Sequence, residues 1–228
     1  MSGRVHVAQR WRSNCRGAKV GVLGMHKVAN PDTDASLDAR GAQLQSEILT
    51  SLSGRSRAEL KQIPTIQAYA DYYKRFGKTY HVQLQLESIL FKGKRIAGSS
   101  ALVQAMFMAE LKNMLLTAGH DLGGVRGDLT VDVATGTERY TLLGGGEQPL
   151  KPGDMFIRDE ESILSSIIYG PDERTRVTSD TRAILFTVYA PAGIRKKELE
   201  THLSDLEANV RLFSPRAEVE SREVVEAG

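Results

Sequence analysis

The sequence predicts an α+β fold, in which a mostly helical first half precedes an antiparallel, β-sandwich-like core flanked by helices. Up to about residue 116, apolar residues recur mostly at helical spacing. From 119 to 191, glycines separate short β-rich runs that recur roughly every ten residues, which is typical of antiparallel sheets. From about 194 to 213 the helical spacing returns.

The first half contains one short strand and four helices in this prediction. The strand is the apolar run at 20–23, and a helix follows over 36–53 with Gly54 after its end. Pro64 begins a second helix that Gly77 closes. A short helix near 84–92 and a longer one over about 99–116 complete this half.

The second half contains five predicted strands and one helix. The strands are expected at 129–133, 140–143, 155–157, 163–169 and 183–189. In the following helix, an apolar seam is expected to pack on the core; it consists of Leu199, Leu203, Leu206 and Val210.

The 228 residues are long enough for a single domain, which we divide into four segments. Residues 1–63 are expected to form a strand-and-helix extension that packs on the core, and residues 64–193 the core itself. Residues 194–213 form an amphipathic helix. Residues 214–228 contain Pro215 and four glutamates, which predict a loose acidic tail.

Composition and charge narrow the class of protein. The chain is 41% hydrophobic and 25% charged, which excludes a disordered chain. Its net charge of +2 conceals six basic and no acidic residues in 1–31, against eight acidic and three basic residues in 198–228. Cys15 is the single cysteine, and no apolar run is long enough to span a membrane. We expect a cytoplasmic protein without a membrane partner.

Several common site motifs are absent. The sequence has no Gly-x-x-x-x-Gly-Lys-Ser/Thr loop and no Gly-x-Ser-x-Gly elbow. The five histidines show no metal-ligand spacing, and a structural zinc is not expected with one cysteine. We therefore expect neither a metal nor another cofactor.

Four stretches together resemble a known family. They are AYADYYKRFGKTYHVQLQLESILFKGKRI (68–96), LLTAGHDLGGVRGDLTVDVATGTERYTLLGG (115–145), LKPGDMFIRDEESIL (150–164) and IIYGPDERTRVTSDTRAILFTVYAP (167–191). In order and spacing they are similar to the B3/B4 domain of the bacterial phenylalanyl-tRNA synthetase beta subunit, in its free-standing form. The second stretch carries the best match, through His120, Asp121, Gly127, Ala134, Gly136 and Glu138.

The resemblance implies a function in translation quality control. The synthetase domain is an editing module that hydrolyses tRNA charged with the wrong amino acid, chiefly tyrosine in place of phenylalanine. A free-standing relative is then expected to deacylate mischarged tRNA in trans. Its implied partners are tRNA or aminoacyl-tRNA and a small amino-acid-like ligand.

The resemblance also implies the site residues. His120 is the candidate general base or water-orienting group, since imidazole titrates near neutrality, and Asp121 stands beside it. The alternative for His120 is a turn histidine with a structural hydrogen bond. We expect the substrate to be bound by Gly119, Arg126, Gly127, Ser166, Tyr169, Gly170 and Thr187.

One departure from the family keeps a second function open. Family members carry at one strand position a glutamate that contacts the substrate's amino group or its equivalent. Aligned on Asp180-Thr181, that position is Thr187 here. The loss of this anion changes the specificity or removes the chemistry. The alternatives are a non-catalytic module that binds an amino acid or a tRNA acceptor end, and a structural subunit without a pocket.

A basic cluster is the candidate RNA-binding surface. It occupies 22 residues with a single acid, Glu87, and consists of Lys74, Arg75, Lys78, Lys92, Lys94 and Arg95. The interleaved Tyr72, Tyr73 and Tyr80 are candidates for stacking on unpaired bases. The alternative is a solvated helix end with core tyrosines.

Overall fold

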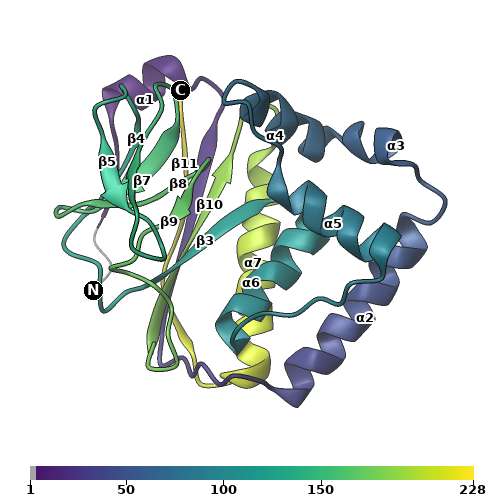
Figure 1. Cartoon of the computed structure of the whole chain (residues 1–228). Coiled ribbons are helices and arrows are strands. Elements are labelled where there is room, and N and C mark those ends of the chain that lie inside the picture. Colours follow the sequence, from purple (N-terminus) through teal and green to yellow (C-terminus); the bar gives the residue numbers. More distant parts are fainter. Residues whose placement is uncertain (1–3) are drawn as a thin grey trace.

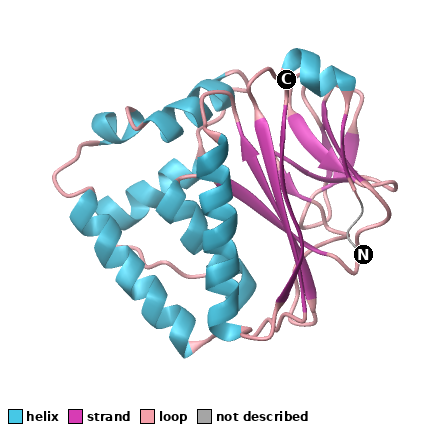
Figure 2. Ribbon diagram, turned by 180° about the vertical axis from the view of Figure 1, so that it is seen from behind, coloured by secondary structure: helices cyan, strands magenta, loops and turns pink. Residues whose placement is uncertain are grey.

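A long four-stranded sheet separates a layer of helices from a second, smaller sheet (Figures 1 and 2). The computed structural model describes residues 4–228. Its helices are α1 (Gln9–Asn14), α2 (Ala35–Ser51), α3 (Arg57–Lys61), α4 (Pro64–Lys74), α5 (His81–Lys92), α6 (Ala101–Asn113) and α7 (Lys196–Phe213). Its strands are β1 (Val5–Val7), β2 (Lys19–His26), β3 (Leu116–Asp121), β4 (Leu129–Val133), β5 (Arg139–Thr141), β6 (Glu147–Pro149), β7 (Met155–Arg158), β8 (Ile163–Ser166), β9 (Gly170–Pro171), β10 (Ala183–Ala190) and β11 (Glu218–Glu226).

Apart from β1, which is parallel to β4, the paired strands are antiparallel. The sheet with the longer strands, called the larger sheet, has the order β11-β2-β10-β3, and a sheet of five shorter strands, called the smaller sheet, has the order β1-β4-β7-β8-β9. Strands β5 and β6 form a separate two-stranded sheet. Helices α6 and α7 cover one face of the larger sheet, and the smaller sheet lies on the side away from them (Figure 1). The predicted α+β class is therefore confirmed.

The first 63 residues contribute more than the packed extension that the sequence predicts. Strand β2 lies in the larger sheet between β10 and β11, and it is fully buried from Val20 to Met25. Helix α3, which the apolar spacing did not indicate, begins with a capping box between Ser56 and Glu59. This N-terminal segment therefore forms part of the core.

The prediction of a loose tail over 214–228 is wrong. Strand β11 pairs with β2 along its length, from Glu218 opposite His26 to Glu226 opposite Lys19. Lys27 and Glu218 form an ion pair of 2.6 Å. Part of the basic start and part of the acidic end of the chain thus meet in neighbouring strands.

Buried tyrosines join α4 and the segment after it to the sheets. Tyr69 and Tyr80 stack with ring centroids 4.2 Å apart, and both rings are fully buried. The Tyr69 hydroxyl accepts a hydrogen bond from Leu116 N–H and donates one to Tyr189 O, which bridges the ends of β3 and β10.

Among the helices of residues 4–228, none has both the length and the apolar character that a membrane crossing needs.

Candidate ligand-binding site

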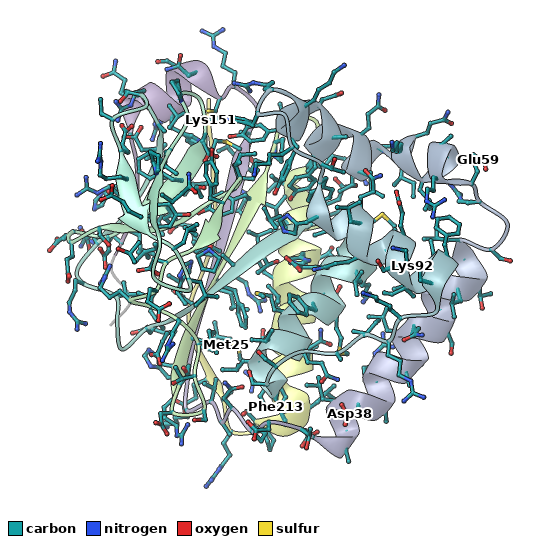
Figure 3. All side chains as sticks on the ribbon, viewed as in Figure 1. Met25, Asp38, Glu59, Lys92, Lys151 and Phe213 are labelled. Atoms are coloured by element: carbon teal, nitrogen blue, oxygen red, sulfur yellow. The ribbon has the colours of Figure 1, made fainter. Side chains whose placement is uncertain are left out.

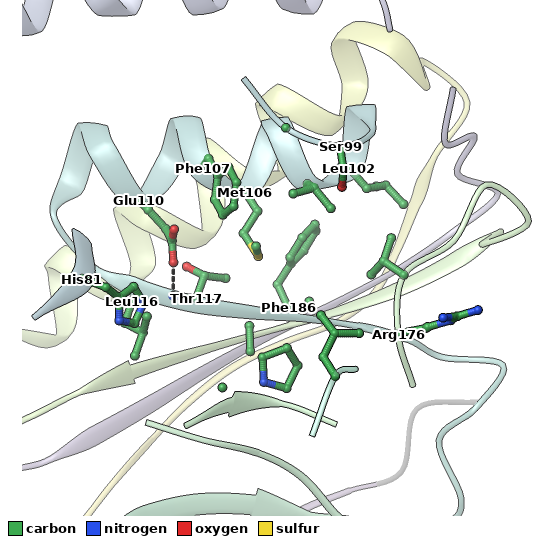
Figure 4. Close-up of a pocket in the computed structure, with 18 of the residues that line it drawn as sticks. His81, Ser99, Leu102, Met106, Phe107, Glu110, Leu116, Thr117, Arg176 and Phe186 are labelled. Atoms are coloured by element: carbon green, nitrogen blue, oxygen red, sulfur yellow. Dashed lines mark hydrogen bonds between the residues drawn. The ribbon is translucent and has the colours of Figure 1, made fainter. Parts of the chain in front are cut away.

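A cavity of about 460 Å³ lies between α5, α6, the outer edge of β3 and the segment around β9 (Figure 4). Its volume falls within the range of small-molecule sites. One wall is a single face of α6, since the residues that border the cavity are spaced at helical intervals. That face carries Leu102, Val103, Met106, Phe107 and Glu110. Phe186 of β10 lies across from it (Figure 4).

Glu110 ends this apolar wall with a carboxyl group. Its side chain is 2% exposed, and its Oε1 accepts a hydrogen bond from the backbone N–H of Thr117 at 2.7 Å. In the described part of the chain, Glu110 has no cationic partner. Burial raises its pKa to about 8, so the carboxyl is mostly protonated at neutral pH and ionises beside a cation.

The outer edge of β3 supplies backbone polar groups to the same cavity. The N–H groups of Leu116 and Leu122 are directed toward the β10 side, whereas those of Thr117 and Asp121 are directed away from it. The N–H of Gly119 lies between the latter two, so strand alternation directs it to the outer edge. Among residues 4–228 no acceptor is found for it. The cavity therefore has an unoccupied backbone donor on its border.

The wall at Thr117 is held from behind by α7. The Thr117 hydroxyl lies 2.7 Å from Nε2 of His202, a histidine that is fully buried. Burial lowers the pKa of His202 to about 3, so its imidazole is neutral at physiological pH. This contact orients the Thr117 side chain toward α7.

A second groove of about 330 Å³ continues from the cavity. The two share His81, Gln85, Ala97 and Phe107, and the groove is also lined by Lys94 and Arg95. Both cations are exposed in the segment that follows α5. An apolar cavity with a carboxyl thus opens into a basic channel.

The candidate catalytic pair lies away from this cavity. His120 is fully buried on the face of β3 opposite Gly119, with Nδ1 2.8 Å from Thr175 Oγ1 and Nε2 3.1 Å from Ser165 Oγ. Asp121 accepts hydrogen bonds from Gly123 N–H and the Thr181 hydroxyl. Neither residue borders the cavity, and both ring nitrogens of His120, which lies in a strand rather than a turn, are within hydrogen-bond distance of buried hydroxyls.

Three of the seven predicted substrate-binding residues border the cavity, and four do not. Gly119, Ser166 and Gly170 border the cavity. Thr187 is buried beside His120, with its Oγ1 3.5 Å from Nε2. The structure places the remaining residues outside the cavity, namely Arg126 and Gly127 in the loop before β4, and Tyr169 beneath Lys78.

The basic cluster is split between the two ends of α5. Lys74, Arg75 and Lys78 precede its start, whereas Lys92, Lys94 and Arg95 lie at its other end, and the 12 residues of α5 itself span about 18 Å. Lys92 is seen there among the helices (Figure 3). Arg75 packs over the rings of Tyr72 and Phe76.

The tyrosines of this segment are not available for base stacking. Tyr72, Tyr73 and Tyr80 are at most 7% exposed, and each hydroxyl donates to a backbone carbonyl. The alternative of core tyrosines therefore holds. Only the Lys94–Arg95 end of the cluster adjoins the cavity.

Sequence reasoning did not single out Glu110. The available signal was its spacing: Glu110 follows Phe107 by three residues and Met106 by four, which places an acidic residue on the apolar face of the helix. No group of three or more His, Cys, Asp or Glu side chains suited to a metal ion is found among residues 4–228.

A family model described as the B3/4 domain matches residues 68–212, well over half of the chain. A crystal structure of an N-terminal fragment of the phenylalanyl-tRNA synthetase beta subunit from Pyrococcus horikoshii is similar, with 13% identity and a TM-score of 0.49. The match covers 99% of this chain and 56% of that fragment, so the chain spans about half of its length. A comparison with curated proteins finds no match.

Proposed function

Because the chain belongs to the B3/4 domain family, we propose that it binds the aminoacyl end of a charged tRNA. The amino acid occupies the cavity beside α6, and phosphates of the acceptor end lie along the groove at Lys94 and Arg95. The observation that carries the proposal is the continuity of the two spaces, which share four lining residues. An apolar space beside cations suits a ligand with an apolar group next to phosphates.

Deacylation of the bound tRNA is the second candidate function. Two groups at the cavity favour it: the unpaired N–H of Gly119, which suits a developing oxyanion, and Glu110, a carboxyl with a pKa near neutrality. Glu110 is the one carboxyl that borders the cavity in residues 4–228. In this reaction the ionised form of Glu110 accepts a proton from the water that attacks the ester carbonyl, the bond between the carbonyl carbon and the ribose oxygen breaks, and Glu110 passes that proton to the departing ribose oxygen.

Binding is tested with matched charged and uncharged tRNAs. We expect wild-type protein to prefer charged tRNA, and Lys94→Glu with Arg95→Glu to weaken binding at least tenfold with a smaller salt dependence. Lys74→Glu is the matched control, since Lys74 is an exposed lysine at the end of α4 that does not line the cavity or the groove. Equal binding of charged and uncharged tRNA, or equal losses in the two variants, contradicts the proposal.

Hydrolysis is tested on the same samples. Release of amino acid from a panel of misacylated tRNAs is followed over time against the protein-free rate. Turnover that disappears in Glu110→Gln at protein concentrations that saturate the tRNA supports the deacylase. Binding without release above the protein-free rate for every tRNA supports a binding module.

A further inference from the structure

We infer that the corner between Glu110 and the outer edge of β3 receives a free α-ammonium group, so that N-acylated aminoacyl compounds are rejected. This inference rests on the proposed function and names the chemical form of its ligand. The ligand is a compound with an unblocked amine next to an acyl carbonyl, such as an aminoacyl ester or amide.

The first step is the state of Glu110. Its carboxyl is buried at the cavity border, its single hydrogen bond leaves acceptor capacity on both oxygens, and no described cation neutralises it. Among the described residues, Arg176 is the one arginine or lysine on the cavity border, and it is already paired with Glu173 at 3.0 Å. The free carboxyl is mostly protonated at neutral pH, and a cationic ligand group supplies the counter-charge that allows it to ionise.

The second step is the pattern of backbone groups at the edge. In an antiparallel strand, the N–H and C=O of one residue are directed to the same side. Thr117 C=O, Gly119 N–H and Gly119 C=O are thus directed to the outer edge, and no partner is found for them in residues 4–228. Together with Glu110, the corner offers the carboxyl oxygens and two backbone C=O groups as acceptors, and one backbone N–H as a donor.

The third step is complementarity. An ammonium group donates three hydrogen bonds and carries the charge that Glu110 needs, whereas the neighbouring acyl oxygen accepts one, as from Gly119 N–H. An N-acyl amide has one N–H, no charge and an added bulky group. Its binding would leave the buried acceptors unpaired, which is costly. The apolar face of α6 beyond Glu110 then receives the amino-acid side chain.

The test uses a panel of amino-acid carboxamides with apolar side chains, each compared with its N-acetyl counterpart by calorimetric titration of the full chain. We expect free-amine members to bind at least roughly tenfold more tightly than their N-acetyl counterparts, as for a charged hydrogen bond. Glu110→Gln should reduce the preference to within about twofold. Ser99→Ala, at the opposite end of the cavity, is the matched control and should keep the preference.

The outcomes separate this inference from the proposed function. Equal or tighter binding of the N-acetyl compounds overturns the inference and leaves tRNA-end binding intact. An unchanged preference in folded Glu110→Gln also overturns it. The wild-type comparison needs no variant, so it decides the matter even where Glu110→Gln does not fold. If no panel member and no charged tRNA binds, the proposed function fails with it.

Discussion

The side chains of His120 and Thr187 face each other on neighbouring strands, with Nε2 of His120 3.5 Å from Oγ1 of Thr187, inside the space between the two sheets. A buried chain of hydrogen bonds continues from Nε2 of His120 to Ser165, and from Ser165 to Tyr189. On the other side, Nδ1 of His120 reaches Thr175. This network joins the larger sheet to the smaller one.

We expect His120→Ala to destabilise the fold by about 2–4 kcal/mol, because it removes hydrogen bonds from buried hydroxyls and opens a cavity. Ligand affinity of the folded fraction should stay within about twofold, since His120 does not border the cavity. Denaturant unfolding and ligand titration measure the two effects. Thr187→Val, which removes only the longest contact, should cost less than about 1 kcal/mol. A variant of normal stability without turnover would instead support a catalytic role for His120.

Local patterns reveal a helix more reliably than they reveal which face of a strand meets a ligand. Pro64 and the apolar spacing after it predict α4 because both signals lie within the element. Strand β11 has glutamates at four of its nine positions, so its strand character depends on β2, almost two hundred residues earlier. His120 and Gly119 are sequence neighbours on opposite faces of β3, and only the packed layers decide which one borders the cavity.

Glu110 should make stability fall as the pH rises. In the unfolded chain it ionises above about pH 4.5, whereas the folded chain keeps its proton up to about pH 8. Folding thus takes up a proton between these values, and stability is lost across that window. We expect Glu110→Gln to gain roughly 3 kcal/mol relative to wild type between pH 4.5 and pH 7. Unfolding free energies at pH 4.5, 7 and 8.5 measure this gain.

The control for this titration is Glu59→Gln, at an exposed helix cap where the pKa is lowered instead. Glu59 is ionised in both the folded and the unfolded chain between pH 7 and 8.5. The difference in unfolding free energy between Glu59→Gln and wild type should therefore stay constant as the pH falls from 8.5 to 7. A difference between Glu110→Gln and wild type that stays constant from pH 4.5 to 8.5 would show that Glu110 does not hold its proton in the folded chain.

Gly119→Val should separate folding from ligand binding. A Cβ at Gly119 meets Met106 Sδ at 3.5 Å and Val177 Cγ2 at 3.6 Å, which are ordinary contacts. Valine also suits a strand, so stability should change by less than about 1 kcal/mol. The added methyl groups enter the cavity and should weaken ligand binding at least roughly tenfold. Unchanged affinity in the folded variant would place the ligand elsewhere.

Removal of residues 218–228 should abolish stable folding. Strand β11 covers the edge of β2, and Arg222 forms an ion pair with Glu207 of α7. The end of the strand is also closed, because Ala227 N–H donates to Ala18 O and Gly17 N–H donates to Ala227 O. The deletion exposes the buried β2 edge and loses these bonds, so we expect aggregation or a strongly lowered thermal midpoint. The control Glu223→Gln keeps the strand and should melt like wild type. A truncated chain with an unchanged midpoint would mean that β11 contributes no more than a loose tail would.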